Sequence, residues 1–186
     1  MSGERTDAEL LALGAAGDQE AFWALVKRHE GRVLNLALRF TRDRQDAEEL
    51  AQDVFFKVWR HARSFRGESS FGTWLYRVAV NACLNFKQRM KARPSPLPLA
   101  DDLEASNPRA ADGLDADERE TRLKSALDAL PARQRLALVL ASFEDKSYEE
   151  IAEAMEVSVA AVESLIFRAR RNLAAILRPL REKGEI

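Results

Sequence analysis

The side chains of this chain that are best suited to chemistry are basic and amide groups on two separate stretches. Residues 77–93 contain five basic residues and no acidic one, and residues 167–181 again contain five basic residues and no acidic one. Arginine and lysine neutralise phosphates, and amides hydrogen-bond to base edges. Two separated basic faces therefore indicate two contacts with a polyanion, although the net charge of the chain is only −1.

The second basic stretch lies on a predicted helix-turn-helix, residues 147–173. Ser147 and Glu150 have the spacing of a capping box, and Ser158 is placed to cap the helix that follows. The buried stripe of that helix recurs at helical spacing: Val162, Ile166, Ala169 and Leu173. Its opposite face carries small, polar, aromatic and basic residues: Ala161, Ser164, Phe167, Arg168 and Arg171. Such a face suits the major groove of DNA, and an ordinary helical hairpin with a solvated basic face is the alternative.

The first basic stretch is predicted to be part of a helix over residues 71–93, which follows a loop interrupted by Gly67. Its inner edge is apolar and consists of Trp74, Leu75, Val78, Ala82 and Phe86. Another side carries basic and amide groups: Arg77, Asn81, Asn85, Gln88 and Arg89. Together with nearby aromatic rings, these groups suit a nucleic-acid strand with unpaired bases. The alternative is a partly buried amphipathic helix whose aromatic residues belong to the core, and most of Trp74 is expected to do so.

The helix predicted over residues 43–63 has an acidic face with an aromatic residue in it. The residues of this face recur at helical spacing: Glu49, Gln52, Asp53, Phe56 and Arg60. An exposed phenylalanine flanked by carboxylates suits a protein partner with basic, partly apolar helices. Alternatively, Phe56 packs against a neighbouring helix and the acidic residues are merely solvated. The spacing does not decide between these two interpretations.

The composition divides the chain into two helical domains. Three prolines end the helix over 71–93, and residues 94–116 are acidic without a sustained apolar period. We therefore expect an all-α protein with a first domain at 1–93, a flexible acidic linker at 94–116, and a second domain at 117–186 that contains the helix-turn-helix.

Two details of these domains follow from the same patterns. In the first domain Asp18 is predicted to cap a helix that runs to about residue 41, with His29 at the margin of its apolar stripe as a structural histidine. In the second domain Pro131 is placed in the first turn of a helix. The inward residues of that helix are expected to be Leu136, Val139, Leu140 and Phe143.

No catalytic chemistry is indicated by the residues present. The chain has one cysteine, Cys83, and two histidines, which provide neither an internal disulfide nor a set of zinc ligands. There is no glycine-rich phosphate loop and no spaced nucleophile and base. We expect a protein that is not an enzyme, that needs no cofactor and no metal, and in which Cys83 is a packed small side chain. The absence of a membrane span and of a signal pattern predicts a cytoplasmic location.

Three segments of the chain together resemble the signatures of the extracytoplasmic-function sigma factors, the short two-domain members of the sigma-70 family. In order, they are DAEELAQDVFFKVWR, FRGESSFGTWLYRVAVNACLNF and LDALPARQRLALVLASFEDKSYEEIAEAMEVSVAAVESLIFRARRNL. The resemblance covers nearly the whole chain outside the linker. It implies a protein that binds core RNA polymerase, directs it to promoters by reading −35 and −10 elements, and promotes strand opening.

The resemblance also implies a role for each face. The clamp helices of the beta-prime subunit of polymerase would bind Glu49, Gln52, Asp53 and Phe56. The −10 element would be bound by Gly67, Glu68, Ser69, Ser70, Trp74, Arg77, Asn81, Asn85 and Arg89. The −35 element would be read by Ala160, Ala161, Glu163, Ser164, Phe167, Arg168 and Arg171. The implied partners are core polymerase with its beta flap, duplex and single-stranded promoter DNA, and an anti-sigma factor, without membrane insertion.

The last helix departs from the family pattern in its small pair Ala160-Ala161 and at Glu163 and Leu165, where many members have lysine or arginine. We expect these departures to affect which −35 sequence the protein prefers, and not its fold. No segment of the sequence is indicated as self-inhibitory. The rival interpretation is a stand-alone helix-turn-helix repressor or activator, which would need neither the acidic face with Phe56 nor the loop before Phe71.

Overall fold

A computed structural model of the chain describes residues 5–92, 124–144 and 146–182, and within them it contains helices and no strand. The elements of the first part are α1 (Asp7–Ala15), α2 (Gln19–Thr41), α3 (Arg44–His61), the short 3-10 helix η1 (Ala62–Ser64) and α4 (Phe71–Ala92). Those of the second part are a helical turn at 124–128, α6 (Ala132–Phe143), α7 (Tyr148–Met155) and α8 (Val159–Glu182). The all-α prediction is confirmed. The predicted linker at 94–116, together with Arg93, lies outside the described residues.

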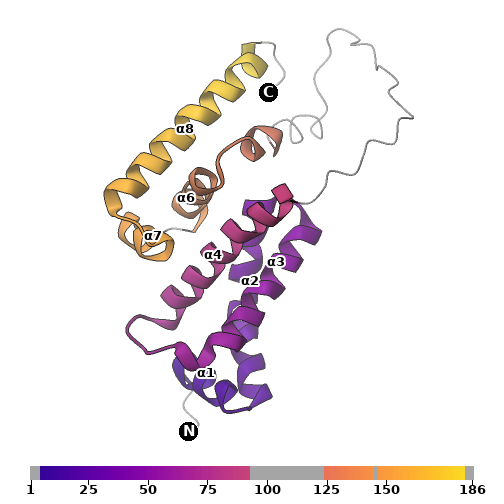
Figure 1. The fold of residues 1–186 in the computed structure, drawn as a ribbon, viewed down its shortest axis with the longest axis vertical. Coiled ribbons are helices and arrows are strands. Elements are labelled where there is room, and N and C mark those ends of the chain that lie inside the picture. Colours follow the sequence, from indigo (N-terminus) through magenta and orange to yellow (C-terminus); the bar gives the residue numbers. More distant parts are fainter. Residues whose placement is uncertain (1–4, 93–123, 145, 183–186) are drawn as a thin grey trace, which may run out of the picture.

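The two parts lie against each other, with α4 of the first part beside α6 and α7 of the second (Figure 1). None of the described helices is long and apolar enough to cross a membrane.

The helices begin where capping residues of the sequence predict. The Asp18 carboxylate accepts a hydrogen bond of 3.0 Å from a backbone N–H in the first turn of α2. Ser147 and Glu150 form the predicted capping box at the start of α7. The hydroxyl of Ser158 accepts a 3.2 Å hydrogen bond from the first turn of α8. Each cap satisfies a backbone donor that the first helical turn leaves without an intrahelical partner.

A left-handed residue makes the turn between α7 and α8. α7 ends at its C-cap Glu156, whose φ is 54°, and the backbone N–H of Glu156 donates back to the carbonyl of Ala152. This backbone conformation closes the end of a helix and redirects the chain. Only Val157 and Ser158 then separate Glu156 from the first residue of α8.

The helices of the first part enclose an apolar core in which α2 packs on α1 and α3, and α4 packs on α3. Its largest buried side chains are Leu11, Leu25, Leu36, Phe40, Leu50, Val54, Val58 and Val80. On α3 the buried residues are Ala47, Leu50, Val54 and Val58, whereas Ala51 and Phe55 are only half-buried.

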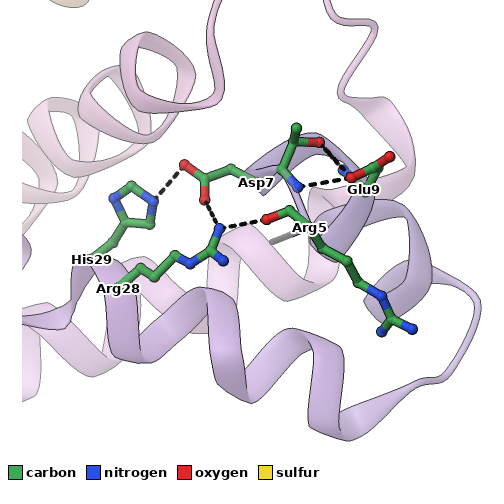
Figure 2. Close-up of polar contacts among 6 residues, drawn as sticks. Arg5, Asp7, Glu9, Arg28 and His29 are labelled. Atoms are coloured by element: carbon green, nitrogen blue, oxygen red, sulfur yellow. Dashed lines mark hydrogen bonds and ion pairs between the residues drawn. The ribbon is translucent and has the colours of Figure 1, made fainter. Parts of the chain in front are cut away.

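A polar contact joins α1 to α2 at the edge of this core. Asp7, in the first turn of α1, lies 2.8 Å from Nε2 of His29 and accepts a 3.0 Å hydrogen bond from Arg28 (Figure 2). His29 is buried, and its ring packs edge-on against Phe71 of α4 with 5.1 Å between the ring centroids. His29 is thus a structural histidine with a satisfied ring nitrogen, as its position on the stripe predicts.

Replacing Asp7 with asparagine is expected to lower the free energy of unfolding by about 1–2 kcal/mol, because two charge-assisted hydrogen bonds lose their charged acceptor. Denaturant unfolding followed by circular dichroism measures the change. The control is Glu20→Gln, which neutralises an exposed carboxylate in the first turn of α2. Equal losses in the two variants would contradict a specific role for Asp7.

The same contact gives stability a pH dependence. Burial alone would raise the pKa of Asp7, but hydrogen bonds from Arg28 and His29 outweigh burial and hold that pKa below 3.8. The ionised Asp7 carboxylate therefore makes its full contribution to the free energy of unfolding above its unfolded-state pKa. That contribution is lost as the pH falls through the lower folded-state pKa. The stability difference between wild type and Asp7→Asn should accordingly be present at pH 7 and shrink below about pH 4.

The second part has a smaller core between α6, α7 and α8. Its buried residues include Leu136, Leu140, Ile151, Met155, Val162 and Ile166. The prediction for Phe143 is wrong, because this ring is 56% exposed and lies 4.8 Å from the guanidinium of Arg39 in α2. Phe143 is the last residue of α6, and it contacts the first part of the molecule instead of the core of its own part.

Candidate functional site

An open apolar groove of about 720 Å³ lies between α2 and α3. It is lined by Phe22, Trp23, Val26, Glu30, Gly31, Leu34, Glu48, Ala51, Gln52, Phe55, Phe56 and Trp59. Three of its aromatic side chains are open to solvent, with Trp23 exposed by 59%, Phe56 by 63% and Trp59 by 40%. A concave apolar surface with exposed rings is typical of interaction sites for partners with apolar side chains of their own.

The groove brings together only part of the acidic face predicted on α3. Gln52 and Phe56 line it, and the exposure of Phe56 excludes the alternative that this ring packs against a neighbouring helix. Glu49 is exposed on the same helix outside the groove lining. Asp53 instead accepts a 2.6 Å hydrogen bond from Arg89 of α4, so these two residues, predicted for different partners, contact each other.

Two tryptophans of the groove escaped the sequence prediction. Trp23 and Trp59 come from different helices, and the ring of Trp59 packs edge-on against Phe22 with 4.7 Å between the centroids. The signal was present in the sequence, because Trp59 follows Gln52 and Phe56 at helical spacing on α3. Trp23 could be placed only with the packing of α2 against α3 in hand.

A second hollow, polar and of about 620 Å³, lies between the loop after η1 and the first half of α4. Its lining is His61, Arg63, Ser64, Phe65, Arg66, Gly67, Glu68, Ser69, Trp74, Arg77, Val78, Asn81 and Glu156. Gly67 has φ 71°, a left-handed conformation that glycine adopts without strain and that turns the loop. The hollow combines aromatic, basic and amide side chains, which are the groups that hold an unstacked base and its phosphates.

Six of the nine residues predicted for the −10 element line this polar hollow: Gly67, Glu68, Ser69, Trp74, Arg77 and Asn81. The other three lie outside its lining. Ser70 uses its hydroxyl to accept a 3.1 Å hydrogen bond from the N–H of Thr73, so it caps α4. Asn85 is exposed further along α4, and Arg89 bonds to Asp53.

An aromatic cluster supports the polar hollow. The ring of Trp74 lies 5.4 Å from that of Phe65 and 6.0 Å from that of Phe71, between centroids. Trp74 is half-buried, so it belongs both to this cluster and to the lining of the hollow. His61, Arg63 and Arg66 were missed because they lie at or after the end of α3 and share no helical face with Arg77.

The outer face of α8 is open to solvent. Phe167 is 66% exposed, and Ala160, Glu163, Arg168 and Arg171 are also exposed, while Ala161 and Ser164 are half-buried. Leu165 is half-buried against the apolar core, which separates it from this outer face. Of the two positions where many family members have lysine or arginine, Glu163 therefore lies on the outer face and Leu165 packs against the core.

Among the described residues no group of histidine, cysteine, aspartate and glutamate could hold a metal ion. The side chains that line these surfaces offer apolar contacts, ion pairs, hydrogen bonds and ring faces for stacking.

Family models match both parts of the chain. Residues 25–93 match Sigma-70 region 2, and residues 120–173 match Sigma-70, region 4. The chain is 36% identical to the RNA polymerase sigma-H factor of Pseudomonas aeruginosa over 189 residues, which is 97% of this chain and 98% of that protein. It is 35% identical to the ECF RNA polymerase sigma-E factor of Escherichia coli over 190 residues, with the same coverage.

Two solved structures resemble the fold. CnrH, solved in complex with the cytosolic domain of CnrY, has a TM-score of 0.64 and 29% identity, covering 93% of this chain and 97% of CnrH. The sigma factor RpoE of Bartonella quintana, solved with the anti-sigma factor NepR, has a TM-score of 0.59 and 24% identity, covering 86% of this chain and 98% of RpoE. The second likeness concerns the fold alone.

Proposed function

Since this chain belongs to the extracytoplasmic-function sigma factors of the sigma-70 family, we propose that it binds core RNA polymerase through the groove between α2 and α3 and reads promoter DNA through the polar hollow and α8. One observation supports the assignment of polymerase and promoter DNA to different surfaces of the first part. The apolar groove and the polar hollow share no lining residue, and most of the residues that line each of them lie in the stretch that matches region 2. The protein acts by binding and positioning, as a sigma factor does, and not as an enzyme.

The groove suits an amphipathic helix of polymerase. Its floor offers aromatic rings, and Glu30 and Glu48 add carboxylates to the lining. A helix that lays apolar residues between Trp23 and Phe56 would bring basic residues on its flanks to these acids. Asp53, already paired with Arg89, would then help to fix α4 against α3 and not contact polymerase directly.

The polar hollow suits a base that has left the duplex. Trp74 and Phe65 offer ring surfaces for stacking, Asn81 offers an amide for a base edge, and the arginines offer charge for the flanking phosphates. Capture of an unpaired base stabilises the opened strand relative to the duplex. This is the physical route by which a protein without catalytic groups promotes strand opening.

The outer face of α8 suits the major groove of the −35 element. Arg168 and Arg171 can contact guanine edges or phosphates, and Glu163 can accept from the amino group of a cytosine. The capping residue Ser158 and the left-handed Glu156 fix how α8 projects from α7. We further propose the domain limits 1–93 and 117–186, which enclose the region 2 and region 4 matches, with 94–116 as the linker.

The proposed location and regulation follow from this role. A protein that works on RNA polymerase is placed in the cytoplasm, and an anti-sigma factor is the proposed regulatory partner. CnrH was itself solved with the cytosolic domain of another protein, which supports a protein partner of that kind for this chain. Co-purification from native cells that yields only polymerase subunits would count against an anti-sigma factor.

Replacing Asn81 with alanine is expected to reduce open-complex formation about tenfold while leaving polymerase binding unchanged, because one base-edge hydrogen bond is worth roughly 1–2 kcal/mol. Permanganate footprinting of the holoenzyme on a promoter measures opening. Asn85→Ala is the matched control, since Asn85 is an exposed asparagine on α4 outside the hollow. Normal opening with Asn81→Ala would contradict binding of the −10 element in the hollow. Equal losses of opening in both variants would instead place the −10 site further along α4.

A further inference from the structure

His61, the last residue of α3, has the only free imidazole ring in the part of the chain that the structure describes. The ring lines the polar hollow and is exposed, and its nitrogens take part in no hydrogen bond or ion pair with the described residues. The other histidine, His29, is buried, with its Nε2 atom 2.8 Å from the carboxylate of Asp7. A buried and satisfied ring supports the fold, whereas a free ring in a hollow can bind a ligand.

The backbone that carries His61 is held in place at the junction of α3 and η1. The hydroxyl of Ser64 donates a 2.7 Å hydrogen bond to the carbonyl of His61. Arg63, in the same turn, donates a 3.4 Å hydrogen bond to the carbonyl of Ala15 in α1. The ring therefore projects from a fixed turn at the end of a helix, and such an element positions a side chain more precisely than a loop does.

Two arginines of the hollow already have carboxylate neighbours. Nη1 of Arg66 lies 3.8 Å from Glu68, and Nη1 of Arg77 lies 3.8 Å from Glu156. A phosphate that approaches either arginine competes with a carboxylate, whereas a phosphate that approaches His61 displaces only water. When it is protonated, an imidazole ring carries a positive charge and donates from both nitrogens, which are the properties that a phosphate contact needs.

The charges along α3 and around the hollow decide when the His61 ring is protonated. Five basic residues and two acidic ones accompany it: Lys57, Arg60, Arg63, Arg66 and Arg77, with Glu68 and Glu156. The excess of basic neighbours disfavours a charged ring, and the carbonyl end of α3 favours it. Both effects are present with and without DNA. The phosphates of a bound strand add negative charge only in the complex, so strand binding favours the protonated ring.

We propose that His61 is a further promoter-binding residue of the polar hollow, whose protonated ring binds a phosphate of the opened strand. Capture of the strand then takes up a proton. Because linkage is reciprocal, protonation of His61 raises the affinity for the strand by the same factor. Histidine changes its charge between about pH 5 and pH 8, so this affinity rises as the pH falls through that range. This role of His61 rests on the proposed binding of the −10 element in the hollow.

The test measures how a single-stranded oligonucleotide with the selected −10 sequence binds to holoenzyme between pH 6 and pH 8. Fluorescence anisotropy at one fixed salt concentration gives the affinity of wild type and of His61→Gln, which keeps an N–H donor but cannot take up a proton. From pH 8 to pH 6 we expect wild type to gain about tenfold in affinity relative to His61→Gln. At pH 8, where a histidine is mostly neutral, the two proteins should bind within about twofold of each other.

A neighbouring arginine provides the matched control. Arg60 is exposed beside His61 at the end of α3, but it does not line the hollow. Arg60→Gln removes a basic charge without removing a group that titrates near neutral pH, so the wild-type pH dependence should remain. Isothermal titration calorimetry at pH 7, in two buffers with different ionisation enthalpies, should show greater proton uptake on strand binding for wild type and Arg60→Gln than for His61→Gln.

Three outcomes would overturn the role of His61. The first is the same pH dependence in wild type and His61→Gln. The second is a loss of affinity in His61→Gln that is equal at pH 6 and pH 8, which would indicate a structural role of the side chain. The third is loss of the pH dependence in Arg60→Gln as well, which would assign it to the general charge of this end of α3. A failure of the hollow as the −10 site would appear separately, as normal opening with Asn81→Ala.

Discussion

Replacing Phe56 with alanine is expected to weaken binding to core RNA polymerase by about 2 kcal/mol or more, which is roughly a thirtyfold loss of affinity. Phe56 projects from α3 with 63% of its surface exposed, so its removal creates no cavity in the core and costs the free protein little stability. Bound to polymerase, the same ring would contact the partner helix that occupies the groove beside Trp23 and Trp59. Fluorescence anisotropy of labelled sigma titrated with core polymerase measures the loss.

The chain offers a closely matched control for this experiment. Phe167 is also a phenylalanine, it is 66% exposed, and it lies on the outer face of α8. Phe167→Ala should leave core binding within a factor of about two, because surface changes outside a binding site are usually worth less than 0.5 kcal/mol. Equal losses in Phe56→Ala and Phe167→Ala would show that the groove is not the polymerase site. Unchanged binding in Phe56→Ala would also contradict it.

Local signals in the sequence were sufficient for the helices and for single faces of them. Side-chain caps such as Asp18 and Ser158 act within three residues of the backbone groups that they satisfy, so they can be read without any tertiary information. The exposed line of Asn81 and Asn85 on α4 was likewise correct, because helical spacing alone determines which residues share a face.

What could not be predicted depends on how helices meet. The groove forms only because Trp23 of α2 lies beside Phe56 of α3. The spacing of residues along one helix does not determine the angle at which it packs against another. Asp53 and Arg89 were assigned to different partners because each faces outward on its own helix, yet packing of α3 on α4 joins them. The spacing of residues shows which of them share a face of a helix, but it does not show whether a neighbouring helix covers that face.

The contact between the domains had one signal that could have been used. Arg135 stands beside Leu136, Val139 and Leu140 on the buried side of α6, where a charged residue is out of place unless it has a partner. A charge on an apolar stripe therefore points to a second surface across from it. The identity of that surface, with the Phe40 carbonyl at its centre, required the structure.

Replacing Arg168 with alanine is expected to cost about 1–3 kcal/mol of affinity, or roughly 10- to 100-fold, for the preferred −35 sequence. Arg168 is exposed on the outer face of α8, almost three helical turns after the cap Ser158 that starts this helix. A recognition helix presents its base-reading side chains on the face that enters the major groove. Electrophoretic mobility shifts of the holoenzyme on duplexes carrying the selected −35 sequence measure the loss, at one fixed salt concentration.

A scrambled −35 duplex and a second arginine separate base reading from general attraction to DNA. If Arg168 contacts a base, its removal should weaken binding to the selected sequence far more than binding to the scrambled one. If it contacts a phosphate, its removal should weaken binding to both duplexes equally and reduce the slope of log affinity against log salt concentration by about one. Arg178→Ala removes an equal charge from an exposed position further along α8, outside the region 4 match. It should leave the preference between the two duplexes unchanged. A preference that survives Arg168→Ala intact would shift base reading to Glu163 and Ser164, the other polar side chains that face outward near the start of α8.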